Sequence, residues 1–134
     1  MASRLTDISG SSDYFEWGIV AYSPAAKEQL LGVPPELIRS HGLVSLEVAR
    51  AMAAGVRDRS GTTLGLATTG VAGPTGGTPE KPVGLVCVGL AWADGTAARE
   101  FHLLGDREQV KYRGAQMALE MLRRHLLGIP MDEV

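Results

Sequence analysis

Three side chains near the N-terminus have the types needed for nucleophilic catalysis. Ser12 follows Gly10-Ser11, Tyr22 closes a short apolar run, and Lys27 comes shortly after it. A serine hydroxyl becomes a good nucleophile when a base takes its proton, and a desolvated lysine can be that base because burial lowers its pKa. A tyrosine hydroxyl could hold the lysine or relay the proton. Turn serines and a solvated lysine explain the same residues, so the pattern alone is a weak indication of an enzyme.

A second candidate site is the uncharged loop Gly70-Val-Ala-Gly-Pro-Thr-Gly-Gly77, which follows an expected strand. Its backbone N–H groups are not covered by side chains, and such a concavity suits an anion or a developing oxyanion. The loop is neither a P-loop nor a GxGxxG motif. A long turn whose glycines take positive φ explains it equally well. The residues therefore leave both readings open.

Metal chemistry is not expected. The three histidines, His41, His102 and His125, are scattered, and no HExxH-type spacing occurs. The single cysteine, Cys87, excludes a cysteine-based zinc site and an internal disulfide, and its place in the most apolar stretch is typical of an inert core thiol. One unpaired cysteine fits a reducing, cytoplasmic setting.

Composition narrows the class of protein. The chain has 134 residues, of which 45% are hydrophobic and 21% charged, and its net charge is −2. These values are typical of one folded domain. Because no basic stripe occurs, we expect no nucleic-acid partner. No apolar run is long enough to span a membrane and the N-terminus lacks a signal-type apolar region, so neither a membrane association nor secretion is expected.

The elements that must position these residues alternate between strands and helices. Apolar runs, caps and turn residues predict strands at 19–22, 63–69, 83–92 and 98–104, and helices at 25–31, around 37–38, from Ser45 to Gly61, and after Asp106. Asp94-Gly95 indicates a hairpin between the last two strands. Strands that alternate with helices, together with one hairpin, predict a single α/β domain of three α/β/α layers with a mixed sheet.

Several motifs resemble one known family in sequence order. Gly10-Ser11-Ser12, Phe15, Gly18–Ser23 and Lys27 resemble GSSxxFxxGxVxYSNxxK. The resemblance continues through Leu31-Gly32-Val33, His41–Ser45, Thr69–Gly77, Lys81–Gly84 and Gly105-Asp106-Arg107. The chain is thereby identified as similar to the C-terminal domain of the competence/damage-inducible protein CinA, a family that includes nicotinamide-nucleotide amidohydrolases. The match covers about residues 5–127.

The resemblance implies hydrolysis of the carboxamide of nicotinamide mononucleotide to nicotinate mononucleotide and ammonia, without metal or organic cofactor. It implies Ser12 as the nucleophile, with Ser11 as the neighbouring choice, Lys27 as the base and Tyr22 as its hydroxyl partner. The small-molecule nucleotide would lie against the glycine loop. The binding residues that it implies are Ser11, Gly70, Ala72, Gly73, Gly76, Gly77 and Lys111.

The chain also departs from the family pattern. The family's domain begins with a helix, a strand and an ESxTGG loop that lines the active site, and residues 1–12 match only the segment after these, so residues 1–134 read as an N-terminally truncated domain. Pro24 and Leu43 replace an asparagine and an alanine, and Lys111 stands where an arginine is usual. The alternative function is a catalytically lapsed binding or assembly module. An exposed sheet edge, or the helix face with Gly114 and Ala118, would support a homo-oligomer.

Overall fold

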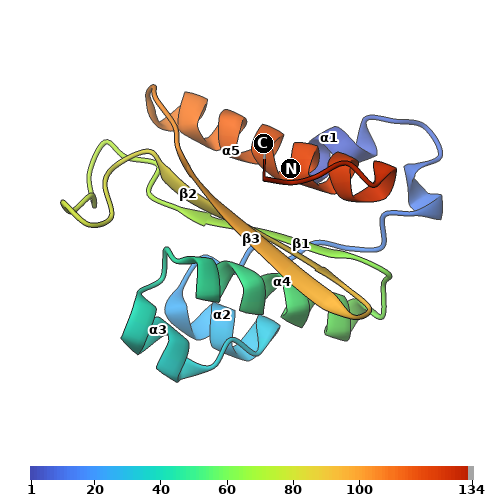
Figure 1. Cartoon of the computed structure of the whole chain (residues 1–134), viewed down its shortest axis with the longest axis horizontal. Helices are drawn as coiled ribbons and strands as arrows, with labels where there is room; N and C mark the ends of the chain where they lie inside the picture. Colours follow the sequence, from blue (N-terminus) through green and yellow to red (C-terminus); the bar gives the residue numbers. More distant parts are fainter. Residues whose placement is uncertain (133–134) are drawn as a thin grey trace.

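A three-stranded sheet lies between two layers of helices in the computed structural model, which describes residues 1–132 (Figure 1). Helices α1 and α5 cover one face of the sheet, and α2, α3 and α4 cover the other (Figure 1). The α/β class and the three layers predicted from the sequence are confirmed. The elements are α1 (Ala2–Thr6), the 3-10 turn η1 (Ser11–Asp13), α2 (Pro24–Leu31), α3 (Pro35–His41), α4 (Leu46–Ser60), β1 (Gly65–Gly70), β2 (Leu85–Trp92), β3 (Gly95–His102) and α5 (Arg107–Leu127).

The described sheet is antiparallel throughout, in the order β1-β2-β3, so the prediction of a mixed sheet is wrong. Gly65 pairs with Ala91, and Trp92 pairs with Gly95 across the expected hairpin. The predicted strand at 19–22 is not part of the sheet either. That segment is extended, but residues 16–22 form no backbone–backbone hydrogen bond with any described residue. A strand exists only when a neighbour completes its ladder, and local apolar character cannot supply one.

The helix boundaries follow from local caps. The Ser45 hydroxyl accepts a hydrogen bond from the Val48 N–H at the start of α4, and Gly61 ends the helix with φ of 69°. Asp106 and Gln109 form a reciprocal capping box at the start of α5. These contacts are made within a few residues along the chain, which is why both helices begin where the sequence predicts.

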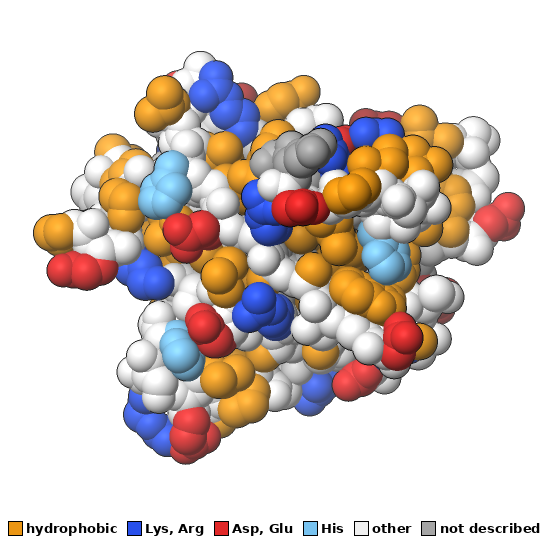
Figure 2. All heavy atoms as spheres, viewed as in Figure 1, with side chains coloured by type: hydrophobic (Ala, Val, Ile, Leu, Met, Phe, Trp, Pro, Cys, Tyr) orange, Lys and Arg blue, Asp and Glu red, His pale blue; other side chains and the backbone are white. Residues whose placement is uncertain are grey.

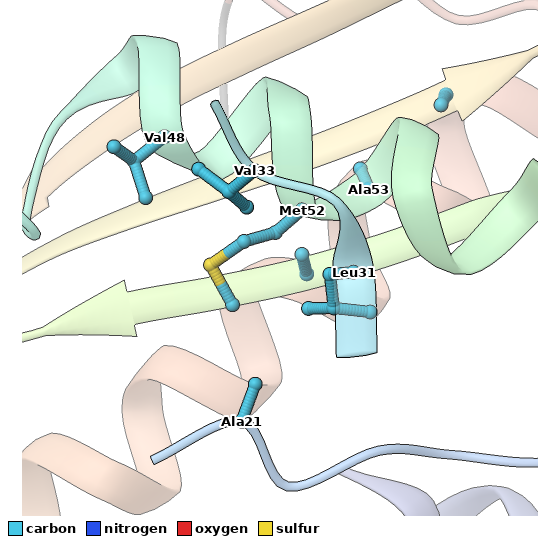
Figure 3. Packing of buried hydrophobic residues seen from close by; sticks show 8 residues of the cluster. Ala21, Leu31, Val33, Val48, Met52 and Ala53 are labelled. Atoms are coloured by element: carbon cyan, nitrogen blue, oxygen red, sulfur yellow. The ribbon is translucent and has the colours of Figure 1, made fainter. Parts of the chain in front are cut away.

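Two apolar clusters hold the layers together. On the α4 face, Leu31, Val33, Val48 and Met52 pack with Ala21 (Figure 3). On the α5 face, the buried members are Val86, Val88, Leu90, Val110, Ala118 and Met121. The central strand β2 is buried along almost its whole length because both clusters cover it. Ala118 is fully buried and Gly114 lies against Val86, so this helix face packs on the sheet and is not free for an oligomer contact.

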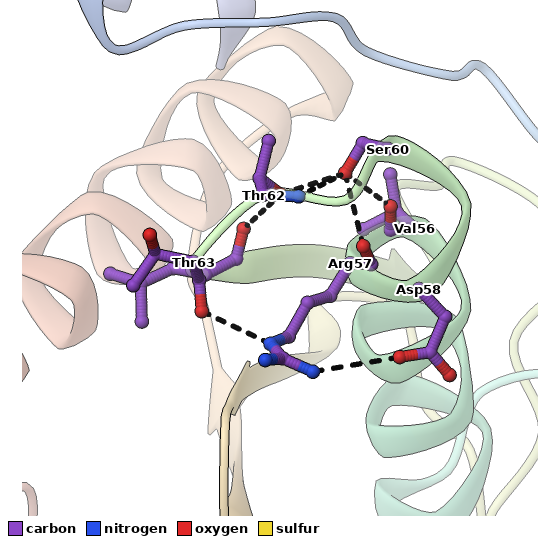
Figure 4. A network of polar contacts seen from close by, with 7 residues as sticks. Val56, Arg57, Asp58, Ser60, Thr62 and Thr63 are labelled. Atoms are coloured by element: carbon purple, nitrogen blue, oxygen red, sulfur yellow. Dashed lines mark hydrogen bonds and ion pairs between the residues drawn. The ribbon is translucent and has the colours of Figure 1, made fainter.

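Helix α4 packs directly on the sheet where glycines face it. A Cβ atom on Gly89 of β2 would lie 2.1 Å from the Ala49 carbonyl oxygen of the helix. At the end of α4, the Ser60 hydroxyl donates to the Val56 carbonyl at 2.7 Å, and Arg57 Nε donates to the Thr63 carbonyl at 3.0 Å (Figure 4). This polar network joins the end of α4 to the turn that precedes β1.

Charges are mixed on the molecular surface. Figure 2 shows acidic and basic side chains interspersed on the face in view. Among the helices that the structure describes, none is both long and apolar enough to cross a membrane.

Candidate active site

Arg107 connects three parts of the chain that are far apart in sequence. It is the first residue of α5, where it follows the cap residue Asp106. Its guanidinium donates one hydrogen bond to the Gly73 carbonyl at 2.8 Å and another to the Tyr22 hydroxyl at 2.9 Å. Tyr22 is otherwise largely exposed to solvent, at 80%. The arginine therefore fixes the tyrosine hydroxyl beside the glycine loop.

Sequence reasoning did not select Arg107 as a site residue. In the sequence it stands only at a capped helix start and within the family's Gly-Asp-Arg motif. The Gly-Asp-Arg sequence could have indicated a functional role for Arg107. A cation at a helix N-terminus is unfavourable because it opposes the helix dipole, so an arginine there indicates contacts elsewhere that stabilise it. The two long-range acceptors supply those contacts.

The glycine loop is partly a packing feature. A Cβ atom on Gly73 would lie 2.5 Å from a methyl group of Val83, and one on Gly77 would lie 2.8 Å from the Val83 nitrogen. Ala72 packs against the apolar cluster on the α5 face. Gly76, in contrast, has a φ of 89° and open space around it. The structure thus supports both interpretations of the loop. Gly73 and Gly77 allow a tight turn, and the space around Gly76 leaves room for a ligand.

Lys27 is buried although it carries a charged group. Its residue is only 8% exposed, and its Nζ donates to the Ala21 carbonyl at 2.7 Å. Within the described residues, no carboxylate forms an ion pair with it. Burial therefore lowers the pKa of Lys27 from its usual value of 10.5. A lysine that loses its proton more easily can act as a general base, and Ala21 places it beside the backbone of Tyr22.

Ser12 lies apart from this group. Ser11 and Ser12 belong to η1, at the opposite end of the sheet from the loop of residues 70–84 (Figure 1). The extended chain of residues 16–22 separates η1 from Tyr22. The Ser12 hydroxyl is exposed and forms no hydrogen bond with any described residue. The structure thus joins Tyr22 to the glycine loop and holds the Lys27 ammonium on the carbonyl of the preceding residue, Ala21, but it does not bring Ser12 to them.

An open depression lies over the first turn of α5. It has a volume of about 270 Å³ and is lined by Arg107, Glu108 and Lys111. Two cations at a helix N-terminus, whose free N–H groups also attract anions, are suited to a phosphate or carboxylate. Among the described residues, no group of three or more metal-ligating side chains gathers.

Comparison with known proteins gives the class to which this α/β/α domain belongs. The chain matches the model of the CinA C-terminal domain over residues 1–126, so it belongs to that family. The membership expected from the motifs is confirmed. The chain is 51% identical to the CinA-like protein of Geotalea uraniireducens, covering 100% of this chain and 32% of that protein. It is 52% identical to the CinA-like protein of Mycobacterium tuberculosis, with 97% and 30% covered.

Solved structures show the same fold. The competence/damage inducible protein CihA from Agrobacterium tumefaciens superposes with a TM-score of 0.87 at 39% identity, over 90% of this chain and 74% of that chain. The competence damage-inducible protein A from Klebsiella pneumoniae gives a TM-score of 0.89 at 28% identity, over 94% and 78%. The chain spans about a third of the length of the curated relatives that it matches.

Proposed function

We propose that this chain is an amidohydrolase that converts nicotinamide mononucleotide to nicotinate mononucleotide and ammonia. The observation that carries the proposal is Arg107, which holds the Tyr22 hydroxyl against the glycine loop and stands with Lys111 and Glu108 at an open depression. A mononucleotide carries a phosphate that such a pair of cations would bind. Family membership supports the reaction class.

The chemistry requires one base and one nucleophile. Amide hydrolysis through an acyl intermediate begins when a hydroxyl oxygen attacks the carboxamide carbon and its proton passes to the base. The base then gives this proton to the amide nitrogen, the C–N bond breaks and ammonia leaves. Water hydrolyses the acyl intermediate, which releases nicotinate mononucleotide and restores the hydroxyl. Lys27 has the burial that a neutral lysine base needs, and the Tyr22 hydroxyl would relay the proton. Ser12 enters as nucleophile through the family resemblance alone.

Arg107→Lys tests the binding geometry. A lysine is a single point donor and lacks the fork that reaches both the Gly73 carbonyl and the Tyr22 hydroxyl. We expect the KM for nicotinamide mononucleotide to rise about 10-fold or more, the cost of losing a charge-assisted contact. The measurement is ammonia release as a function of substrate concentration. The matched control is Arg113→Lys on the same helix, because within residues 1–132 Arg113 donates only to the nearby Leu104 carbonyl. Equal KM changes in both variants would count against this site.

Ser12→Ala separates the enzyme from the alternative function. If Ser12 is the nucleophile, ammonia release should disappear while the circular dichroism spectrum and the melting temperature stay unchanged. Wild-type turnover in Ser12→Ala would remove the nucleophile assignment and leave the role to another hydroxyl or to water.

A binding module is the second candidate function, and the position of Ser12 favours it. The serine lies away from Lys27 and Tyr22, so the three groups are not assembled for catalysis in this arrangement. A folded wild-type protein that binds nicotinamide mononucleotide but releases no ammonia would support the module and refute the enzyme.

A further inference from the structure

We propose that the tip of the β2–β3 hairpin is a site of spontaneous modification, at which Asp94 converts to isoaspartate through a cyclic succinimide formed with Gly95. The chain contains no asparagine, and Asp94 is the only aspartate in it that precedes a glycine. Ala93 and Asp94 form the turn between the two strands, and both are exposed. Trp92 and Gly95 pair directly before and after this turn. The proposal does not depend on the proposed amidohydrolase activity.

The reaction needs only these two residues and water. The Gly95 backbone nitrogen attacks the side-chain carboxyl carbon of Asp94 in its protonated form, a C–N bond forms, and the carboxyl OH leaves with the N–H proton as water. Water then adds to one succinimide carbonyl carbon, and the C–N bond at that carbon breaks. Cleavage at the side-chain carbonyl restores aspartate. Cleavage at the main-chain carbonyl leaves the chain running through the Asp94 side chain, which is isoaspartate.

Asp94 differs from the other aspartates in its neighbour and its contacts. Glycine has no Cβ, so it leaves its own nitrogen open to attack. The other aspartates precede isoleucine, tyrosine, arginine or glutamate. Asp58 lies inside α4, and the carboxylate of Asp106 accepts a hydrogen bond from the Gln109 N–H at 2.9 Å. Among the described residues, none donates a hydrogen bond to the Asp94 carboxylate, so this group can turn toward the Gly95 nitrogen.

The turn at the hairpin tip is easily opened. Within residues 1–132 only glycines have positive φ, so neither Ala93 nor Asp94 has it. The two-residue turns that match the twist of the flanking strands need positive φ, and turns without it splay the strands. The Trp92–Gly95 pair is also the last of the β2–β3 ladder, and the ends of a ladder open first. The Gly95 nitrogen is therefore released for attack more readily than a nitrogen inside the sheet.

Isoaspartate at this position would disturb the packing of Trp92. The product adds one methylene group to the main chain of the turn. A Cβ atom on Gly95 would lie 2.7 Å from the Trp92 ring, so the ring lies directly against the hairpin backbone. The same ring stacks on His125 in the last turn of α5, with the ring centroids 4.7 Å apart. A longer turn would therefore move Trp92 relative to His125 and change the tryptophan fluorescence.

Incubation of the wild-type protein in mildly acidic buffer tests the proposal. Isoaspartate is located by enzymatic methylation and by mass spectrometry of a digest. We expect roughly tenfold more isoaspartate at Asp94 than at any other aspartate, because only glycine leaves the attacking nitrogen uncovered. The matched control is Asp94→Glu, which keeps the charge but would have to close a larger ring, so this position should accept no methyl group. A synthetic peptide of residues 90–99 verifies that the conditions allow the reaction.

Tryptophan emission is followed in the same samples. In a Trp17→Phe background Trp92 is the remaining tryptophan, and its emission should change in step with isoaspartate formation and stay constant in Asp94→Glu. Modification of the peptide but not of the folded protein would show that the hairpin protects the bond, and it would refute the site. Equal modification at Asp58 or Asp106 would refute it as well. Isoaspartate at Asp94 with unchanged emission would support the site and overturn the inferred effect on Trp92.

Discussion

Replacing Lys27 by methionine should abolish ammonia release from nicotinamide mononucleotide and at the same time make the protein more stable. A general base contributes about 10²–10⁴-fold to the rate, so kcat/KM should fall by at least the lower figure. Methionine fills similar volume without a buried charge. We expect the melting temperature to rise by about 3–5 °C, the shift that ~1 kcal/mol gives a domain of this size.

The pH dependence of stability follows from the direction of the pKa shift. Burial lowers the pKa of Lys27 in the folded state relative to the unfolded chain, so between the two values the unfolded chain binds more protons. The contribution of Lys27 to the free energy of unfolding therefore rises with pH through that window and levels off above the usual value of 10.5. Lys27→Met should remove this contribution. Urea melts at several pH values measure it.

Two further variants complete this test. Lys27→Arg keeps a charge that arginine cannot release, so it should lose activity without gaining stability. Lys81→Met removes a lysine that is only half-buried, so it should leave the melting temperature near that of the wild type. Undiminished turnover in Lys27→Met would exclude Lys27 as the base, whatever happens to stability.

The largest effect on folding is expected from Gly55→Ala in α4. Alanine is the better helix former by about 1 kcal/mol, so propensity alone predicts stabilisation. A Cβ atom on Gly55, however, would lie 1.8 Å from the Leu31 carbonyl oxygen at the end of α2. The added Cβ is fixed to the α4 backbone and the Leu31 oxygen belongs to the α2 backbone, so neither atom can rotate away. The two helices must therefore separate and open the cluster around Val33 and Met52. We expect a net loss of about 2–4 kcal/mol in the free energy of unfolding.

Gly114→Ala is the matched control for this clash. It makes the same substitution inside a helix, but the nearest atom to its Cβ would be a Val86 methyl group at 3.3 Å, which can shift. Chemical denaturation of both variants gives the comparison. Similar free energies of unfolding for Gly55→Ala and Gly114→Ala would show that α2 and α4 are not in fixed contact.

Local signals predicted most of the secondary structure. Ser45 and Gly61 bound α4, and Asp106 begins α5, because a cap is a contact between residues a few positions apart. The Asp94-Gly95 hairpin was predictable for the same reason. The family could also be predicted, since its motifs are short and stand in order along the chain.

Part of the candidate site could be predicted as well. Lys27 and Tyr22 were selected by residue type, and in the structure the Lys27 ammonium contacts the carbonyl of Ala21, the residue before Tyr22; their roles stay a prediction. The burial that lowers the pKa of Lys27 could not be inferred, because it depends on which helices cover α2. Arg107 was missed because its contact with Tyr22 joins residues 85 positions apart.

The sequence by itself thus determined the helix ends, the β2–β3 hairpin, the α/β class and the family, all of which rest on short-range contacts or on motifs. The tertiary structure alone decided that residues 19–22 form no strand, that Arg107 tethers Tyr22 to the glycine loop, and that Ser12 lies at the far end of the sheet. The reason is physical: a ladder or a long-range hydrogen bond requires a partner whose position is set by packing, and apolar pattern and residue type carry no information about where that partner lies.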